Sequence, residues 1–174
     1  MTELEALRAE KDELFAHDPG SPLSPAQKRT FHGLRYFPEY PALRLQVRLE
    51  PPQTNAPLEM QTSTGEVQVY ERLGRFRFDV DGKRQELTIY QGEHGLFLPF
   101  VDSLAGKETY PAGRYIEPEE LPDGSYLVDF NQAYNPYCAY NEMWSCPITP
   151  PENRLTVPVR AGEKLFDQEG DRGA

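Results

Sequence analysis

The sequence predicts a mainly β protein with a minor α component, built as an antiparallel β-barrel or sandwich with one long and one short N-terminal helix. After residue 43, hydrophobic and polar residues alternate in short runs, which is the period of strands with one buried face. Short turns containing Gly or Pro join these runs and leave no room for the crossover helices that parallel strands require. With 11% aromatic residues the chain is typical of a folded protein, so its 17 prolines serve turns rather than disorder.

The chain length of 174 residues corresponds to one domain of ordinary size. We expect this single domain over residues 1–169, with a helical cover at 1–33 and a β core at 43–160 that includes an irregular loop at 131–153. Residues 170–174 are expected to form a frayed tail, as chain ends commonly do.

The first helix is expected to begin after Thr2, because Thr2 and Glu5 have the spacing of a capping box. Asp18-Pro19-Gly20 ends it. Its hydrophobic side chains fall near one face, at Leu4, Leu7, Leu14 and Phe15. The pattern predicts an amphipathic helix that covers the core.

A second, short helix is indicated by Ser24 as the N-cap, followed by Pro25 at the first helical position. Gln27 lies three residues after the cap, and Gly33 is the expected stop. This helix is also expected to be a cover rather than part of the core.

The clearest pair of strands is a hairpin in which Asp81-Gly82 joins alternating runs at 75–80 and 83–90. The two-residue turn fixes the register, because it pairs residue 80 with 83. One face then carries the hydrophobic side chains of both strands, Phe76, Phe78, Val80, Leu87 and Ile89. The other face brings opposite charges together, Asp79 with Arg84 and Arg77 with Glu86, and such pairs contribute about 0.2–1 kcal/mol each.

The remaining strands are predicted from the same alternation. One strand is expected at 43–50, where Pro51-Pro52 ends it. The others are expected at 66–72, 95–101, 109–116, 124–130 and 155–160.

The charge of the chain excludes some classes of partner. Lys and Arg number 18 against 28 Asp and Glu, so the formal net charge is −10, which argues against nucleic acid and against an anionic membrane surface. No apolar run has the roughly 20 residues that a spanning helix needs, and the acidic amino terminus does not resemble a signal peptide. We therefore expect a cytoplasmic protein with no nucleic-acid or membrane partner.

Residues 131–151 differ from the rest of the chain, because Glu142 is their only charged residue in a chain that is 26% charged. This neutral loop also holds both cysteines, the single tryptophan and three tyrosines. Loops normally lie in water and carry charges. We therefore expect the neutral loop to pack against the sheet.

Several runs of residues carry a resemblance to a known family. They include Phe100-Val101-Asp102-Ser103, Gly113-Arg114-Tyr115, Asp129-Phe130-Asn131, Ala133-Tyr134-Asn135-Pro136, Cys138-Ala139-Tyr140, Pro150-Pro151-Glu152-Asn153-Arg154-Leu155 and Ala161-Gly162-Glu163-Lys164. With these runs the chain resembles, over nearly its whole length, the uncharacterised bacterial and archaeal family catalogued as domain of unknown function 1684. Leu104 and Glu117 depart from the family pattern, which has Thr and Asp there. The resemblance implies a family identity and no established activity.

The first candidate site consists of Asp102, Arg114, Asp129 and Asn131. If the strands at 109–116 and 124–130 pair, Arg114 lies opposite Asp129. Arg114 could then anchor a small polar or anionic ligand with its planar donor fork while Asp129 orients it. The alternatives are a structural ion pair that holds the neutral loop, or an acid pair for hydrolysis formed by Asp102 and Asp129.

Further candidates lie near these residues in the sequence. Tyr110, Tyr115 and Tyr134 could line a pocket with their rings, or could be core residues whose hydroxyls contact the backbone. Asn135 lies in the same neutral loop, where amide side chains are expected to satisfy polar backbone atoms or a ligand. Glu152 and Asn153 follow two prolines and indicate a turn, with a general base at Glu152 as the functional alternative.

Cys138 and Cys146 have a spacing that matches neither a zinc knuckle nor a Cys-x-x-Cys redox motif. Buried free thiols are the favoured interpretation, and a disulfide or a reactive thiol remain as alternatives. The sequence indicates no metal site, because two thiolates would leave a tetrahedral metal half coordinated and the three histidines lie far away in the sequence. It indicates no cofactor, since it contains no Walker loop and no Gly-x-Gly-x-x-Gly motif.

Two functions remain after these exclusions. The leading hypothesis is a small-molecule-binding domain that could also act as a hydrolase, with its site where Arg114, Asp129 and the neutral loop converge. The alternative is a non-catalytic interaction or scaffold domain, in which the family-like residues only brace a long buried loop.

Overall fold

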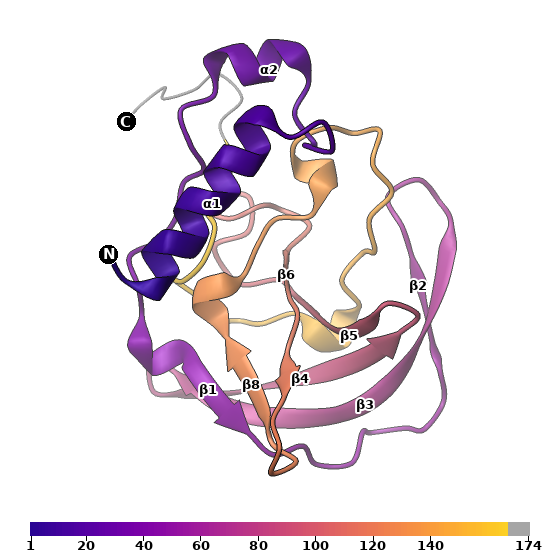
Figure 1. The fold of residues 1–174 in the computed structure, drawn as a ribbon. Coiled ribbons are helices and arrows are strands. Elements are labelled where there is room, and N and C mark those ends of the chain that lie inside the picture. Colours follow the sequence, from indigo (N-terminus) through magenta and orange to yellow (C-terminus); the bar gives the residue numbers. More distant parts are fainter. Residues whose placement is uncertain (167–174) are drawn as a thin grey trace.

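The computed structural model describes residues 1–166 and has a mainly β architecture. A five-stranded antiparallel sheet curves into a half-barrel, a three-stranded antiparallel sheet lies beside it, and two helices cover one end (Figure 1). The predicted fold class is therefore confirmed. The tail expected at 170–174 lies outside the described residues.

The larger sheet has the strand order β2-β3-β4-β5-β6. Its strands are β2 (Leu58–Gln61), β3 (Val67–Val80), β4 (Lys83–Gly92), β5 (Gly95–Phe100) and β6 (Arg114–Ile116). The runs predicted separately at 66–72 and 75–80 form one long strand, β3, and β2 was not predicted. The strand predicted at 109–116 begins only at Arg114, because Thr109 forms an isolated bridge with Ala105 and residues 110–113 form a turn.

The β3–β4 hairpin has the predicted register, in which Val80 pairs with Lys83 and Phe76 with Leu87. The hydrophobic face is buried as predicted, at Phe76, Phe78, Val80, Leu87 and Ile89. On the other face both predicted charge pairs form, Arg77–Glu86 at 3.3 Å and Arg84–Asp79 at 3.7 Å. The Asp81-Gly82 turn and the alternation of hydrophobic residues specify the same register, so the local sequence is sufficient to determine the hairpin.

A glycine allows β3 to continue through an irregularity in its pairing. The register with β4 shifts between Arg72 and Gly74. A Cβ at Gly74 would lie 2.8 Å from the Cβ of Leu49 and 2.9 Å from the carbonyl oxygen of Glu50. The absence of a side chain therefore lets the chain around Glu50 approach closely enough to bridge Arg75.

The smaller sheet has the order β1-β8-β7, with β1 (Arg44–Val47), β8 (Tyr126–Asp129) and β7 (Glu119–Glu120). The predicted pairing of 109–116 with 124–130 is wrong, because β6 pairs with β5 whereas β8 pairs with β1 and β7. The turn at 121–125 instead connects β8 to the two-residue strand β7. The chain passes from one sheet to the other through Pro118, which has no N–H to donate to a ladder.

The main core lies between the two sheets and is closed by the C-terminal segment, residues 155–164. Leu155, Val157, Val159 and Ala161 are buried there. The predicted alternation of buried residues at 155–160 is present, but the segment is not a strand. Its backbone groups bind side chains and a loop instead of a neighbouring strand, as described below.

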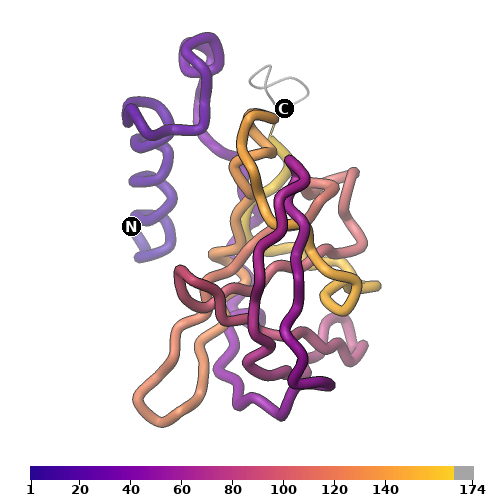
Figure 2. The backbone as a smooth tube through the Cα atoms, turned by 90° about the vertical axis from the view of Figure 1, so that its right-hand side faces the viewer, coloured from indigo at the N-terminus to yellow at the C-terminus, as the bar shows by residue number. Residues whose placement is uncertain are grey.

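Both N-terminal helices, α1 (Glu3–His17) and α2 (Pro25–Thr30), begin with the predicted capping boxes. They lie together on one side of the molecule (Figure 2). α2 ends at Thr30 with Phe31 as its C-cap, two residues before the expected stop at Gly33. Among residues 1–166, neither helix is long and apolar enough to cross a membrane.

The predicted apolar face of α1 is only partly correct. Phe15 is buried, whereas Leu7 and Leu14 are each 42% exposed. α1 contacts the body of the protein through Phe15 and through polar side chains, because Arg8 donates to the carbonyl oxygen of Phe37 at 3.1 Å and Asp12 accepts from a backbone N–H at 2.9 Å. Helical periodicity alone does not reveal such polar docking.

The neutral loop contacts the larger sheet at its two ends, as expected, and packs on a helix in its middle. Its first part bridges β6 at Tyr134, but its middle packs on α1, where Tyr140 lies edge-on to Phe15 with ring centroids 5.1 Å apart. Its end binds the β2–β3 turn, where Cys146 and Ser63 exchange hydrogen bonds. The short 3-10 helices of this region are η2 (Phe130–Gln132), η3 (Tyr137–Ala139) and η4 (Pro151–Asn153).

Candidate functional site

Arg114 is only 1% exposed and binds the C-terminal segment. Its guanidinium donates to the carbonyl oxygens of Val159 at 2.9 Å, Ala161 at 2.5 Å and Glu163 at 3.1 Å. Arg114 thus supplies hydrogen-bond donors to three carbonyl oxygens that would otherwise be buried without a partner. In a β-sheet, a neighbouring strand would supply these donors.

Asp102 completes the environment of Arg114. Its carboxylate lies 3.6 Å from the Arg114 guanidinium and accepts hydrogen bonds from the Thr109 hydroxyl at 2.7 Å and the Val159 N–H at 2.8 Å. Burial lowers the pKa of Arg114 to about 10, although Asp102 and Glu163 oppose this shift. Arg114 therefore remains charged at neutral pH, and its charge is balanced inside the protein.

The predicted pairing of Arg114 with Asp129 is wrong, because the two residues lie on different sheets. Asp129 ends β8, lies 3.8 Å from Arg44, and accepts hydrogen bonds from the backbone and side chain of Asn131 at 3.0 Å each. The buried Asn131 side chain in turn exchanges two hydrogen bonds with the backbone of Tyr40. Asp129 and Asn131 are thus neighbours, while Asp102 and Arg114 form a separate cluster.

Glu163 is a buried carboxylate that the sequence analysis did not single out. It lies 2.6 Å from the Lys11 ammonium of α1 and accepts hydrogen bonds from the Tyr140 hydroxyl at 3.0 Å and the Asn135 N–H at 2.5 Å. The Asn135 side chain also donates to the carbonyl oxygen of Lys164 at 3.0 Å. Glu163 and Asn135 therefore join α1, the neutral loop and the C-terminal segment.

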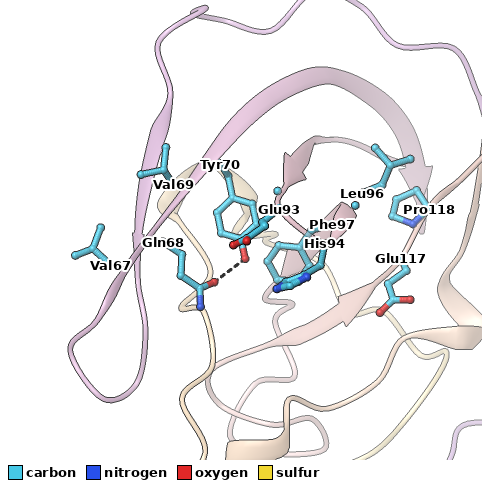
Figure 3. A pocket seen from close by; sticks show the side chains of 12 residues that line it. Val67, Gln68, Val69, Tyr70, Glu93, His94, Leu96, Phe97, Glu117 and Pro118 are labelled. Carbon is cyan, nitrogen blue, oxygen red and sulfur yellow. Dashed lines mark hydrogen bonds between the residues drawn. The ribbon is translucent and has the colours of Figure 1, made fainter.

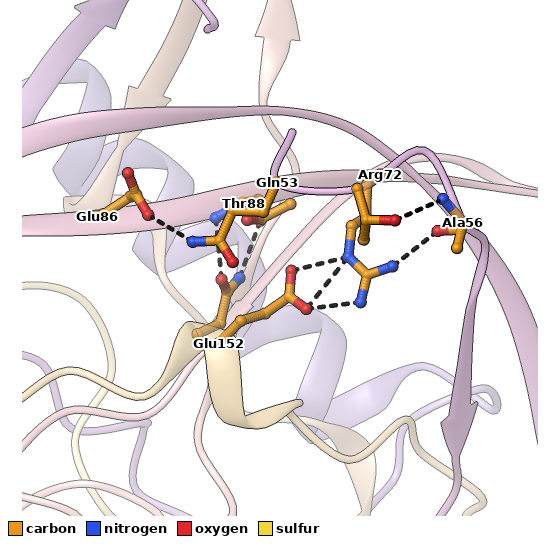
Figure 4. A network of polar contacts seen from close by, with 8 residues as sticks. Gln53, Ala56, Arg72, Glu86, Thr88 and Glu152 are labelled. Atoms are coloured by element: carbon orange, nitrogen blue, oxygen red, sulfur yellow. Dashed lines mark hydrogen bonds and ion pairs between the residues drawn. The ribbon is translucent and has the colours of Figure 1, made fainter. Parts of the chain in front are cut away.

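Asn153 and Glu152 lie on η4 and hold it against the larger sheet. The fully buried Asn153 amide accepts from the Thr88 N–H and donates to the carbonyl oxygens of Thr88 and Pro99 at 2.8–2.9 Å. Glu152 accepts three hydrogen bonds from Arg72 of β3, the shortest at 2.8 Å (Figure 4). Burial raises the pKa of Glu152, but the hydrogen bonds and charge of Arg72, together with the nearby Tyr90 and Thr88 side chains, outweigh it and hold this pKa below its usual value.

The three predicted tyrosines do not gather in one pocket. Tyr115 is buried and donates to the carbonyl oxygen of Pro147. Tyr110 donates to the Cys138 sulfur at 3.7 Å. Tyr134 is half-buried and donates to Glu117 at 2.9 Å, at the surface between β6 and β7.

A groove runs over this surface and is made of three adjoining hollows. The first, about 670 Å³, lies between the β2–β3 hairpin and the β4–β5 turn and reaches Glu117. The second, about 170 Å³, extends from Glu117 past Tyr134 to Asp129, and the third, about 450 Å³, continues from Asp129 to the start of α1. Asp129, Asn131 and Tyr134 are the predicted site residues that line this groove.

Aromatic and aliphatic side chains form the walls of the first hollow. Val67 and Val69 lie on the hairpin side and Leu96 and Pro118 on the opposite side, with Tyr70 and Phe97 between them (Figure 3). Behind the lining, aromatic rings continue toward the second hollow. Ring centroids are 5.4 Å apart for Tyr70–Phe97, 4.7 Å for Phe97–Tyr115 and 5.9 Å for Tyr115–Tyr134.

Carboxylates dominate the charge of the groove. Glu93, Glu117 and Glu119 line it and are exposed. Over residues 1–166, no Lys, Arg or His lies within ion-pair distance of these three carboxylates. Arg44, which lines the third hollow, pairs with Asp129 instead. The groove therefore offers negative charge next to apolar surface.

Both cysteines are free. Within the described residues, no three His, Cys, Asp or Glu side chains come together in a way that could hold a metal ion. Cys146 is buried and Cys138 is half-buried.

The lining of the first hollow was not predicted from the sequence. Val67 and Val69 are 53% and 61% exposed, which is unusual for alternating valines in a strand. Their alternation predicts a buried face, and nothing local in the sequence shows that the hairpin extends beyond the core. The residues Gly92-Glu93-His94-Gly95 are typical of a turn, but nothing in them indicates that the turn lines a groove.

The comparisons with known proteins identify relatives without an assigned function. Residues 29–164 match the family model described as "Protein of unknown function (DUF1684)". No curated protein matches the chain. Among solved structures, the chain is similar to the solution NMR structure of the uncharacterized protein from gene locus rrnAC0354 of Haloarcula marismortui, with 35% sequence identity and a TM-score of 0.69. That match covers 93% of this chain and 92% of the archaeal one.

Proposed function

The chain belongs to the DUF1684 family, whose model covers residues 29–164, and on that premise we propose that it binds a small organic cation in the groove. The observation that carries this proposal is a set of three carboxylates that form no ion pair within residues 1–166, Glu93, Glu117 and Glu119, beside an apolar and aromatic wall. Ligand sites commonly combine apolar lining with a few polar anchors. An arylalkylamine has both parts, a ring for the wall and an ammonium group for the carboxylates.

The charges favour a cation over the anionic ligand that the sequence suggested. An anion would need Arg114, whose guanidinium is buried and already bound to three carbonyls and to Asp102. In the groove an anion would meet Glu117 and Glu119 without a free cation nearby in residues 1–166. The carboxylates of the groove would repel an anionic ligand, whereas they and the aromatic faces would attract an ammonium group.

Hydrolysis is less well supported by the same geometry. The acid pair considered from the sequence requires Asp102 near Asp129. Asp102 accepts hydrogen bonds from Thr109 and Val159 in the core, and Asp129 lies on the groove bound to Asn131. We therefore propose binding without assigning a reaction.

Isothermal titration calorimetry with a matched pair of probes tests this proposal. Tryptamine and indole-3-propionate share the indole ring but carry opposite charges. We expect saturable binding of tryptamine and none of indole-3-propionate at the same concentration. Because charge contacts in water are screened by salt, tryptamine should bind more weakly as the ionic strength rises.

The variant Glu119→Gln has a matched control on the same strand. Glu119 lines the groove, whereas Glu120 is exposed and absent from its lining. Glu119→Gln is expected to weaken tryptamine binding about three- to tenfold, from the loss of a charge contact worth about 1 kcal/mol. Glu120→Gln, which removes the same charge, should leave the affinity unchanged. Equal effects of both variants would contradict binding in the groove.

A non-catalytic interaction or scaffold domain is the second candidate. The burial of Arg114 and Asn153 favours it, because these family-like residues brace the C-terminal segment and η4. No saturable binding of either indole probe would favour this candidate over a ligand-binding domain.

A further inference from the structure

The two cysteines lie side by side although neither is bonded to the other. Cys138 belongs to η3, and Cys146 follows eight residues later at the end of the neutral loop. The Cys138 N–H donates to the Cys146 sulfur at 3.3 Å. Both thiols are free, so the neutral loop holds a dithiol in contact rather than two unrelated buried cysteines.

Each cysteine is held in place from a different part of the fold. Cys146 donates its N–H to the Ser63 hydroxyl at 3.1 Å and accepts from the Ser63 N–H at 2.9 Å, which fixes it to the β2–β3 turn. Next to Cys138, Tyr137 packs edge-on against Phe15 of α1 and against Trp144, with ring centroids 6.1 and 5.1 Å apart. The contact between Cys138 and Cys146 is therefore a consequence of tertiary packing on both sides.

The surroundings make the two thiols chemically different. The Cys146 side chain, and after it the Tyr110 hydroxyl at 3.7 Å, lower the pKa of Cys138 to about 6, against the effect of burial. The Cys138 side chain, followed by burial, raises the pKa of Cys146. A half-buried thiolate next to a buried protonated thiol is the arrangement in which one sulfur attacks an oxidant and the other resolves the product.

We propose that Cys138 and Cys146 form a site that reacts with hydroperoxides, with Cys138 as the attacking residue and Cys146 as the resolving residue. The Cys138 thiolate attacks one oxygen of hydrogen peroxide, so an S–O bond forms, the O–O bond breaks, and the leaving hydroxide takes up a proton to give water. Cys138 is thereby oxidised by two electrons to a sulfenic acid, and the peroxide is reduced.

The second step closes a disulfide. The Cys146 sulfur gives up its proton and attacks the Cys138 sulfur, so the S–S bond forms, the S–O bond breaks, and the hydroxyl group leaves as water with that proton. The new bond joins η3, which packs on α1, to the residues bound to the β2–β3 turn. The oxidised protein consumes one peroxide per chain and holds no free thiol.

The experiment starts from reduced full-length protein with the reductant removed, treated with one equivalent of hydrogen peroxide. Intact-mass spectrometry is expected to show the loss of two hydrogens, and thiol titration should fall from two thiols per chain to none, since both cysteines of the chain are free. Non-reducing electrophoresis should show a monomeric product. A product that gains oxygen atoms while a thiol remains, or that is linked between chains, would overturn the proposal.

Single variants separate the two roles. Cys146→Ser is expected to stop at the sulfenic acid, which dimedone traps on Cys138, whereas Cys138→Ser should consume peroxide at least tenfold more slowly than the unchanged protein. If both variants consumed peroxide at the same rate, the assignment of the attacking residue would be wrong. The Cys146→Ser trapping result decides the proposal even if Cys138→Ser does not fold.

Tyr110 is a positioning residue in this proposal, and its role has its own readout. In Tyr110→Phe the midpoint of the pH profile for alkylation of Cys138 by iodoacetamide should move to higher pH, because the thiolate loses a hydrogen bond. Tyr126→Phe, at a partly buried tyrosine of β8, is the control and should leave the midpoint unchanged. An unchanged midpoint in a folded Tyr110→Phe would remove Tyr110 from the site.

Discussion

Arg114 lies in a cage that is formed entirely by the protein. Its guanidinium carbon is 5.1 Å from the ring centroid of Phe100 and 6.0 Å from that of Phe37, and its donors face three carbonyls of the C-terminal segment. A planar guanidinium suits this position because it can stack on rings and bind several acceptors in its plane. We infer that Arg114 stabilises the fold.

The first prediction concerns Arg114→Ala. Removing one partner of a buried charge pair leaves Asp102 without its counter-ion and three carbonyls without a donor, so the free energy of unfolding should fall by about 3–5 kcal/mol. Urea denaturation measures this change. Arg84→Ala, at an arginine whose side chain is 65% exposed, should change the stability by less than about 0.5 kcal/mol. Equal midpoints for Arg114→Ala and the unchanged protein would contradict the structural role.

A second prediction at this scale concerns pH. Because the folded-state pKa of Glu152 lies below its unfolded value, which is about 4.3, the Arg72–Glu152 pair contributes stability that is fully present above that pH and is lost as the pH falls through the folded pKa. At neutral pH, Glu152→Gln should lower the free energy of unfolding by about 1.5–3 kcal/mol, as expected for hydrogen bonds to a charged group.

Below about pH 4.3, the stabilities of Glu152→Gln and the unchanged protein should converge. Denaturation series at several pH values measure the gap between them. The exposed Glu120→Gln should follow the unchanged protein throughout. A gap that stays constant from pH 7 to pH 3 would show that the Glu152 charge does not stabilise η4.

Single residues were the hardest features to predict from the sequence. Asp102, Arg114 and Asn153 were singled out as candidate site residues, but their partners lie far away in the sequence. Asp102 and Arg114 bind the C-terminal segment, and Asn153 binds the backbone of β4 and β5. Glu163 was missed because its partner Lys11 belongs to α1 and no spacing connects the two. The residue type shows that a buried polar side chain needs hydrogen-bond partners. Only the tertiary structure shows which residues those partners are.

At the scale of elements, the structure depends on glycines where chain segments cross. Gly113, just before β6, has a φ of 101°, and a Cβ there would lie 2.5 Å from the Phe100 carbonyl oxygen and 2.9 Å from a Val101 methyl group. Gly106, in the preceding turn, has a similar φ of 83° but no atom within 4 Å of a Cβ. A side chain at either position would strain the backbone, but only a side chain at Gly113 would also overlap with neighbouring atoms.

Gly113→Ala should therefore destabilise the protein more than Gly106→Ala. Both variants place an alanine in the left-handed region, at a cost of about 1–2 kcal/mol. Only Gly113→Ala adds overlap with backbone and side-chain atoms, worth about 1–3 kcal/mol more. Thermal unfolding measures both, and equal losses of stability would show that the β5–β6 contact is looser than the structure indicates.

Elements with strong local chemistry could be predicted, and those that depend on distant partners could not. The β3–β4 hairpin and both helix starts were predicted correctly because turn type, strand period and capping residues act locally. The strand at 124–130 was predicted to pair with 109–116, but it pairs with β1 and β7. β7 has only two residues, too few to show the alternation of a strand. The run at 155–160 has the period of a strand, but Arg114 and Asp102 take up backbone groups that a ladder would use.

At the scale of the whole molecule, the predicted candidates divide into two groups. One group, including Asp102, Arg114, Asn135 and Asn153, is buried and holds the irregular parts of the chain together. The other group, Asp129, Asn131 and Tyr134, borders an acidic groove between the two sheets. The sequence placed both groups in one site because they are close in the chain, whereas the division into two sheets separates them.

We propose that ligand binding occurs in the groove and not around Arg114. A titration of ¹⁵N-labelled protein with tryptamine, followed by ¹H–¹⁵N correlation spectra, tests it most directly. We expect saturable shifts of the amide signals of groove-lining residues, Gln68, Leu96, Glu117 and Gln132. The amide signals of Asp102, Arg114 and Val159 should not shift. Binding in the groove would be contradicted if the shifts were confined to the residues around Arg114, or if no groove residue shifted saturably.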